Sequence, residues 1–147
     1  MTGPRIILRR EFEVHAAHRL EHYEGKCSNL HGHLFRIFIS VADTYDLDKG
    51  FSLDFGELKR IVEENIINKL DHQNLNDVLP LNPTAENITL WCWFTLNKNC
   101  PDLDLDQIEV YETDKSCGIM TKEIYDEYKN SYYFDEFLDK MGANIIK

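Results

Sequence analysis

A chain of 147 residues with 43% apolar and 12% aromatic residues is long enough to bury the core of one domain, which excludes a disordered protein. The formal charge of −10 argues against a nucleic-acid-binding surface, and no apolar run is long enough to span a membrane. The first residues lack the apolar core of a signal peptide, and the four cysteines contain no C-x-x-C pair. We therefore expect a cytoplasmic protein with free thiols.

Two strands are expected first, over residues 5–18 and 33–43, because apolar residues alternate in both segments. His18 ends the apolar face of the first strand, and His31 and His33 share the parity of the apolar positions of the second. An H-x-H pair alone is either half of a metal site or two polar residues at a strand entrance. Three histidines that converge from neighbouring strands, with a fourth position open, are typical of a catalytic zinc.

Two helices are expected next. A turn at residues 46–50 precedes a helix that Asp54 caps and that ends near Lys69, followed by a loop over residues 70–77. Thr84 is placed to cap the second helix, which ends at residues 100–102. Its apolar stripe predicts that its two tryptophans and Cys92 lie in the core.

The remaining elements complete the fold prediction. Residues 107–113 alternate as a strand, and residues 118–120 begin a returning one. The order β-β-α-α-β-β indicates an α+β domain in which two helices cover an antiparallel four-stranded sheet. Residues 122–147 predict a further amphipathic helix, which either forms a subunit contact or packs on the domain.

Several polar residues are candidates for chemistry. Glu112 continues the apolar face of its strand, and a carboxylate that enters a core needs a partner. That partner is either a structural cation or a ligand with adjacent N–H and NH2 groups, such as a pterin or guanine. Asp71-His72 is either a solvated pair or, if His72 reaches Cys27, a base that activates the thiol.

A local basic cluster is the one feature that favours an anionic ligand. Arg19, His22 and Lys26 lie close in sequence to the candidate metal ligands. They either contact a phosphate group or belong to a solvated loop.

Six ordered blocks together resemble the 6-pyruvoyl-tetrahydropterin synthase / 6-carboxy-tetrahydropterin synthase family. They are F-E-V-H-A-A-H-R-L from Phe12, C-S-N-L-H-G-H from Cys27, D-F-G-E-L-K from Asp54, L-D-H-Q-N-L-N from Leu70, N-P-T-A-E-N from Asn82 and V-Y-E-T from Val110. The resemblance implies a tunnelling fold (T-fold) over residues 1–121, with residues 122–147 as a C-terminal extension outside the family pattern. It also implies a homohexamer, a dimer of trimers, with active sites between subunits.

The resemblance assigns roles by position. Zn²⁺ would be held by His18, His31 and His33, and Cys27 would accept a proton. Asp71 and His72 would complete the proton relay, arriving from a neighbouring subunit. The pterin of dihydroneopterin triphosphate would be anchored by Glu112, in a pocket lined by Thr84, Ala85 and Glu86.

Two activities of this family start from 7,8-dihydroneopterin triphosphate. The pyruvoyl enzymes eliminate triphosphate and rearrange the side chain, whereas the carboxy enzymes of queuosine (7-deazaguanine) biosynthesis also release acetaldehyde. The three residues between Cys27 and His31 resemble the carboxy type, so a 6-carboxy-tetrahydropterin synthase is expected. The alternatives are a pyruvoyl synthase and a non-catalytic zinc protein that binds a pterin.

Overall fold

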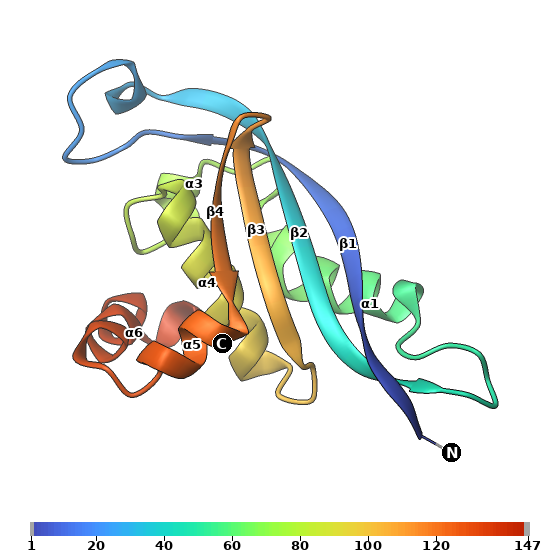
Figure 1. Ribbon diagram of the computed structural model, residues 1–147. Helices are drawn as coiled ribbons and strands as arrows, with labels where there is room; N and C mark the ends of the chain where they lie inside the picture. The colour runs from blue at the N-terminus through green and yellow to red at the C-terminus, as the bar shows by residue number, and fades with distance from the viewer. Residues whose placement is uncertain (1, 146–147) are drawn as a thin grey trace.

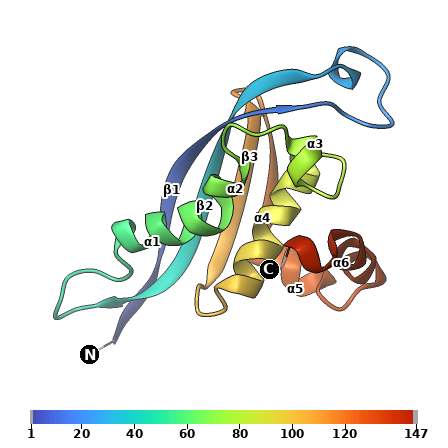
Figure 2. The same cartoon turned by 180° about the vertical axis from the view of Figure 1, so that it is seen from behind.

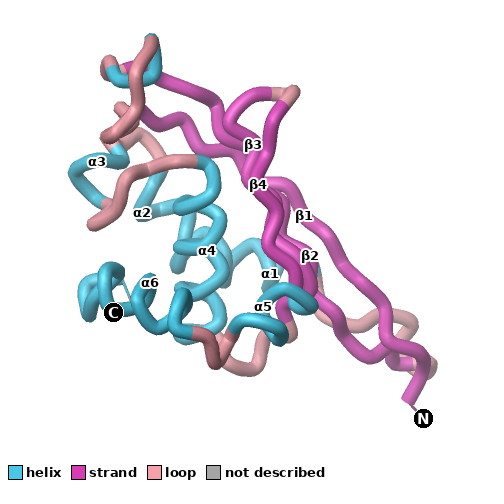
Figure 3. Tube along the Cα trace, turned by 60° about the vertical axis from the view of Figure 1, so that its left-hand side comes forward, coloured by secondary structure: helices cyan, strands magenta, loops and turns pink. Residues whose placement is uncertain are grey.

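The computed structural model describes residues 2–145, in which four strands form one antiparallel sheet in the order β1-β2-β3-β4. The strands are β1 (Thr2–His18), β2 (His31–Asp46), β3 (Leu105–Thr113) and β4 (Ser116–Thr121). Figure 1 and Figure 3 show that the helices all lie on one face of this sheet. The predicted α+β class is confirmed, with β1 and β2 longer than expected.

The first helical segment follows the predicted boundaries. Asp54 accepts a hydrogen bond from the Glu57 N–H at 3.3 Å, which caps α1 (Phe55–Val62). The helical path continues through the π-helical turn η2 (Glu63–Ile67) and α2 (Asn68–Leu70). Figure 2 shows this segment lying against the strands, beside α4 (Ala85–Asn99).

The predicted loop over residues 70–77 contains one short helix, α3 (Leu75–Val78). The Asn74 side chain caps this turn by accepting a hydrogen bond from the Asn76 N–H at 3.2 Å. Leu75 is buried, so the turn is held by core packing as well as by its cap. A single helical turn has too few residues to produce a periodic pattern, which is why the sequence did not reveal it.

The core lies between the helices and the sheet face to which the alternating apolar residues of β1 and β2 belong. Trp91, Cys92 and Trp93 of α4 are buried in it, as predicted. Burial raises the pKa of the Cys92 thiol well above its usual range, because the thiolate would be desolvated. Cys92 is therefore a packing residue without nucleophilic character at neutral pH.

The C-terminal extension forms two helices, α5 (Lys122–Tyr128) and α6 (Tyr132–Ile145), where one was expected. Residues 146–147 of the expected extension lie outside the described residues. Phe134 is buried, and its ring centroid lies 5.2 Å from that of Phe94 in α4. The extension thus packs on the helical layer through α4, on the side of the domain away from the open face of the sheet.

Candidate active site

Three histidines meet where β1 ends and β2 begins. His18 pairs directly with His31 in the antiparallel register, and His33 pairs with Ala16. Because alternate strand residues point to one face, this register brings the three imidazoles together on the core side. Their ring centroids lie 4.6 Å apart for His18–His31, 4.8 Å for His31–His33 and 5.2 Å for His18–His33.

Hydrogen bonds orient two of these rings. The Nδ1 atom of His18 lies 2.7 Å from the carbonyl oxygen of Pro83, and that of His31 lies 2.7 Å from the carbonyl oxygen of Asn29. A carbonyl oxygen can only accept, so both Nδ1 atoms carry the proton and both Nε2 atoms present a lone pair. Backbone carbonyls of this kind commonly orient metal-binding imidazoles.

The three Nε2 atoms of this cluster are buried and have no hydrogen-bond partner within the described residues 2–145. Desolvation by burial lowers the pKa of His18 and of His33, although the charge of Glu112 opposes the effect. These two imidazoles are therefore neutral at neutral pH, as a metal ligand must be. The cluster, defined as His18, His31 and His33, has the donor set and the unpaired lone pairs that a metal ion requires.

Glu112 of β3 lies beside this histidine cluster. Its Oε1 atom is 3.4 Å from Nε2 of His33, a contact without hydrogen-bond geometry. One oxygen of Glu112 and one nitrogen of each histidine all lie within 4.8 Å of one another. The carboxylate can thus serve as a fourth metal ligand or accept N–H groups from a molecule bound beside the metal.

Cys27 lies in the loop between the two histidine-bearing strands. It belongs to the 3-10 turn η1 (Lys26–Ser28), and its side chain is partly buried. The Leu20 N–H donates to the Cys27 carbonyl at 2.8 Å, which closes this loop across its base. The loop that carries Cys27 therefore joins the segments of His18 and His31, and no hydrogen bond links Sγ of Cys27 to His72 among the described residues 2–145.

Asp71 and His72 are attached to the edge of β1 through its backbone. The His15 N–H donates to Oδ1 of Asp71 at 2.9 Å, and the His72 N–H donates to the His15 carbonyl at 2.6 Å. Nδ1 of His72 lies 3.0 Å from Oδ2 of Asp71. These bonds run to backbone groups of His15 at the edge of β1, and neither Asp71 nor His72 belongs to the group of ligand atoms that meets at the histidine cluster.

Thr84, Ala85 and Glu86 form the start of α4. Thr84 accepts the Asn87 N–H at 3.1 Å, so its hydroxyl caps the helix. The Ala85 carbonyl accepts the Thr89 hydroxyl at 2.6 Å, whereas the Glu86 side chain is exposed. This segment adjoins the histidine cluster through Pro83, whose carbonyl holds His18, a contact that no sequence pattern indicated.

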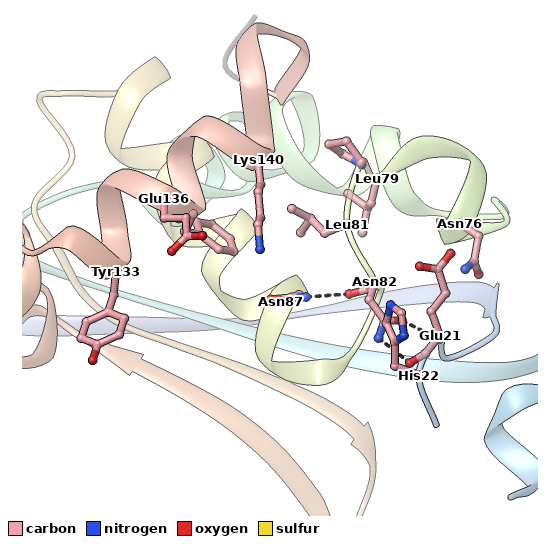
Figure 4. A pocket seen from close by; sticks show the side chains of 12 residues that line it. Glu21, His22, Asn76, Leu79, Leu81, Asn82, Asn87, Tyr133, Glu136 and Lys140 are labelled. Atoms are coloured by element: carbon pink, nitrogen blue, oxygen red, sulfur yellow. Dashed lines mark hydrogen bonds between the residues drawn. The ribbon is translucent and has the colours of Figure 1, made fainter. Parts of the chain in front are cut away.

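A cleft of about 720 Å³ lies beside this segment and not at the histidine cluster (Figure 4). One wall comes from α6 of the extension, including Lys140, and the other carries His22 and Asn82. The Asn82 side-chain amide accepts a hydrogen bond from the Glu21 N–H and donates one to the Glu21 carbonyl, so it links the loops that carry these two residues. Of the three basic residues noted in the sequence, only His22 lines this cleft.

None of the helices among residues 2–145 is both long and apolar enough to cross a lipid bilayer.

Relatives of known activity match this chain. A 6-carboxy-5,6,7,8-tetrahydropterin synthase from Synechocystis is 42% identical over 113 residues, which cover 73% of this chain and 86% of the relative. A dihydroneopterin monophosphate aldolase from Pyrococcus furiosus is 38% identical over 74% of this chain and 89% of its own. The human 6-pyruvoyl tetrahydrobiopterin synthase is 35% identical over 63% of this chain and 68% of its own.

A solved structure from another organism has a similar fold. The structure of Caenorhabditis elegans 6-pyruvoyl tetrahydropterin synthase superposes with a TM-score of 0.72 and 24% identity, covering 82% of this chain and 98% of that one. The sequence profile described as 6-pyruvoyl tetrahydropterin synthase matches residues 7–123. The chain therefore belongs to the 6-pyruvoyl tetrahydropterin synthase family, whose members are lyases, as the ordered motifs predicted.

Proposed function

We propose that this protein is a zinc-dependent 6-carboxy-5,6,7,8-tetrahydropterin synthase of queuosine (7-deazaguanine) biosynthesis. It would convert 7,8-dihydroneopterin triphosphate to 6-carboxytetrahydropterin and release acetaldehyde and triphosphate. The observation that carries this choice is the gap of three residues between Cys27 and His31, which resembles the carboxy branch. The 42% identity to a relative of that name supports it.

The histidine cluster would hold the zinc ion through the three buried Nε2 atoms. Zinc would supply Lewis acidity that polarises the oxygens of the substrate side chain. Cys27 would accept a proton from that side chain, and its place between the two histidine-bearing segments supports this role. Glu112 would anchor the pterin by accepting its adjacent N–H and NH2 groups with both carboxylate oxygens.

Asp71 and His72 would complete the proton relay across a subunit boundary. Within one chain they are attached to the edge of β1, outside the group of ligand atoms at the histidine cluster, and a second copy could supply them. The proposed assembly is a homohexamer, a dimer of trimers, in the cytoplasm. Residues 1–121 would form its synthase domain and residues 122–147 an appended extension. Thr84 to Glu86 would line the pterin pocket at the start of α4.

Product analysis tests this proposal. The purified protein is loaded with zinc and incubated with dihydroneopterin triphosphate. Acetaldehyde and 6-carboxytetrahydropterin in equal amounts are the expected products. A pyruvoyl product without acetaldehyde would instead assign the protein to the branch of its human relative. Tight pterin binding without turnover would refute catalysis and leave a binding protein, and turnover of only the monophosphate would place it with the Pyrococcus relative.

A further inference from the structure

The hydrogen bonding at the outer edge of β1 continues beyond His18, the last residue of the strand. On this edge the Ala17 N–H donates to the Gln73 carbonyl at 3.0 Å. The backbone polar groups of alternate residues point to the same edge of a strand. The next residues at this spacing are Arg19 and Glu21, which lie in the loop after the strand.

Two asparagine side chains take the place of a neighbouring strand at these residues. The Asn76 side chain accepts the Arg19 N–H at 2.8 Å and donates to the Arg19 carbonyl at 3.0 Å. The Asn82 side chain makes the same pair of bonds with Glu21, each 2.9 Å long (Figure 4). A side-chain amide offers an oxygen acceptor and an NH2 donor, so it can pair with both backbone groups of one residue. The two asparagines therefore extend the pairing of this edge past His18.

The segment that carries these asparagines also orients His18. The Pro83 carbonyl, which accepts the Nδ1–H of His18, belongs to the residue after Asn82. The Asn82 carbonyl accepts the Thr84 N–H at 2.8 Å and the side-chain NH2 of Asn87 at 2.9 Å. Asn82 thus links the loop after His18 to the start of α4, beside the carbonyl that holds the ring.

His31 is oriented in a different way. Its Nδ1–H donates at 2.7 Å to the carbonyl of Asn29, two residues before it in the chain. This contact is local and needs no second segment. His18 instead depends on a carbonyl that is 65 residues away in the chain. Its orientation therefore requires that two distant segments stay docked.

We propose that Asn76 and Asn82 are positioning residues, which hold the chain after His18 against the segment of Pro83 and so keep the His18 ring aimed at the metal. This inference rests on the proposed function, in which the histidine cluster holds zinc. The bond from the second ring nitrogen fixes the tautomer and the direction of a metal-binding imidazole, and loss of such a partner costs about 10–100-fold in metal affinity. Because the asparagines act on the segment of the carbonyl and not on the ring, about tenfold is expected for each.

The test compares full-length variants that leave every histidine in place. Asn82→Ala and Asn76→Ala each remove both side-chain bonds to the loop after the strand. Asn65→Ala is the matched control, because the Asn65 side chain also links separate parts of the fold. It donates to the Ile61 carbonyl at 2.8 Å and accepts from the Asn99 side chain at 3.3 Å, at the other end of α4 from the histidine cluster.

Two measurements are made on each folded variant. Zinc affinity, measured by competition with a chelator, should fall about tenfold in Asn82→Ala and in Asn76→Ala and stay unchanged in Asn65→Ala. NMR of the metal-free protein follows the Nδ1–H protons of His18 and His31, whose carbonyl bonds slow their exchange with water. Asn82→Ala should speed this exchange at His18 and leave His31 unaffected, a difference that general destabilisation would not produce.

Unchanged zinc affinity in both loop variants would overturn the inference, and so would an equal loss in Asn65→Ala. Faster exchange at His18 and His31 together would also overturn it, because it would report general loosening. If Asn82→Ala does not fold, Asn76→Ala decides by the same measurements. If the unsubstituted protein forms no products, the proposed function fails, while the exchange at His18 still decides whether the asparagines hold the ring. If products form but both measurements are unchanged, only the inference fails.

Discussion

Zinc binding to the histidine cluster should stabilise the fold by an amount set by the ratio of free zinc to its Kd. Without metal, three buried Nε2 atoms lack partners, and each buried unsatisfied polar group costs about 1–3 kcal/mol. Free zinc at 100 times its Kd adds about 2.7 kcal/mol of stability. With an unfolding entropy of about 2.1 cal/mol/K per residue, the chain of 147 residues loses roughly 0.3 kcal/mol per degree near its midpoint. Zinc should therefore raise Tm by roughly 9 °C.

Thermal unfolding of the metal-free protein, with and without zinc, measures this shift. His31→Ala removes one ligand nitrogen and should lose most of the shift, together with most of the bound zinc. His22→Ala is the matched control, because His22 is an exposed imidazole outside the cluster, and it should keep the full shift. An equal zinc shift in His31→Ala and the unsubstituted protein would refute the assignment of the metal site.

Three further predictions concern other parts of the molecule. Cys27→Ala should reduce turnover by about 10²–10⁴-fold while the zinc content persists, and the control Cys117→Ala should keep its activity. Loss of zinc from Cys27→Ala would instead show that the thiol is a metal ligand. Burial lowers the pKa of His18, so between that pKa and about 6.5 the unfolded chain binds more protons than the folded protein. The Tm of the metal-free protein should therefore fall as the pH decreases through this window. A Tm that rises there would contradict the desolvation of His18. Phe134→Ala should lower the free energy of unfolding in urea by about 3–5 kcal/mol, because the Phe134 side chain is buried. Tyr133 is 73% exposed, so Tyr133→Ala should lower it by less than about 0.5 kcal/mol. Equal losses would show that the extension does not pack as described.

The sequence predicted the sheet and its apolar face because strand periodicity is a local property. His18 could be grouped with the H-x-H pair on parity alone, and the antiparallel register then placed it opposite His31. The same reasoning could not find the carbonyl of Pro83, which is 65 residues away from His18 in the chain. It also did not indicate the contact of His15 with His72, since those residues share no periodic pattern.

For the C-terminal extension, too, the sequence predicted the local structure but not the contacts. Its amphipathic pattern predicted helix but not the break between α5 and α6, and not its contact with α4. Glu112 was recognised as a carboxylate in need of a partner, and its position beside His33 emerged only from the pairing of β2 with β3.

The sequence by itself determined the family, the strand faces and the candidate ligands, because each depends on residue type and on spacing along the chain. The tertiary structure decided which of those residues meet. It joined His18, His31, His33 and Glu112 at one point, since strand register acts over long sequence distances. It also separated Asp71 and His72 from that point, because the loop that carries them bonds to the outer edge of β1.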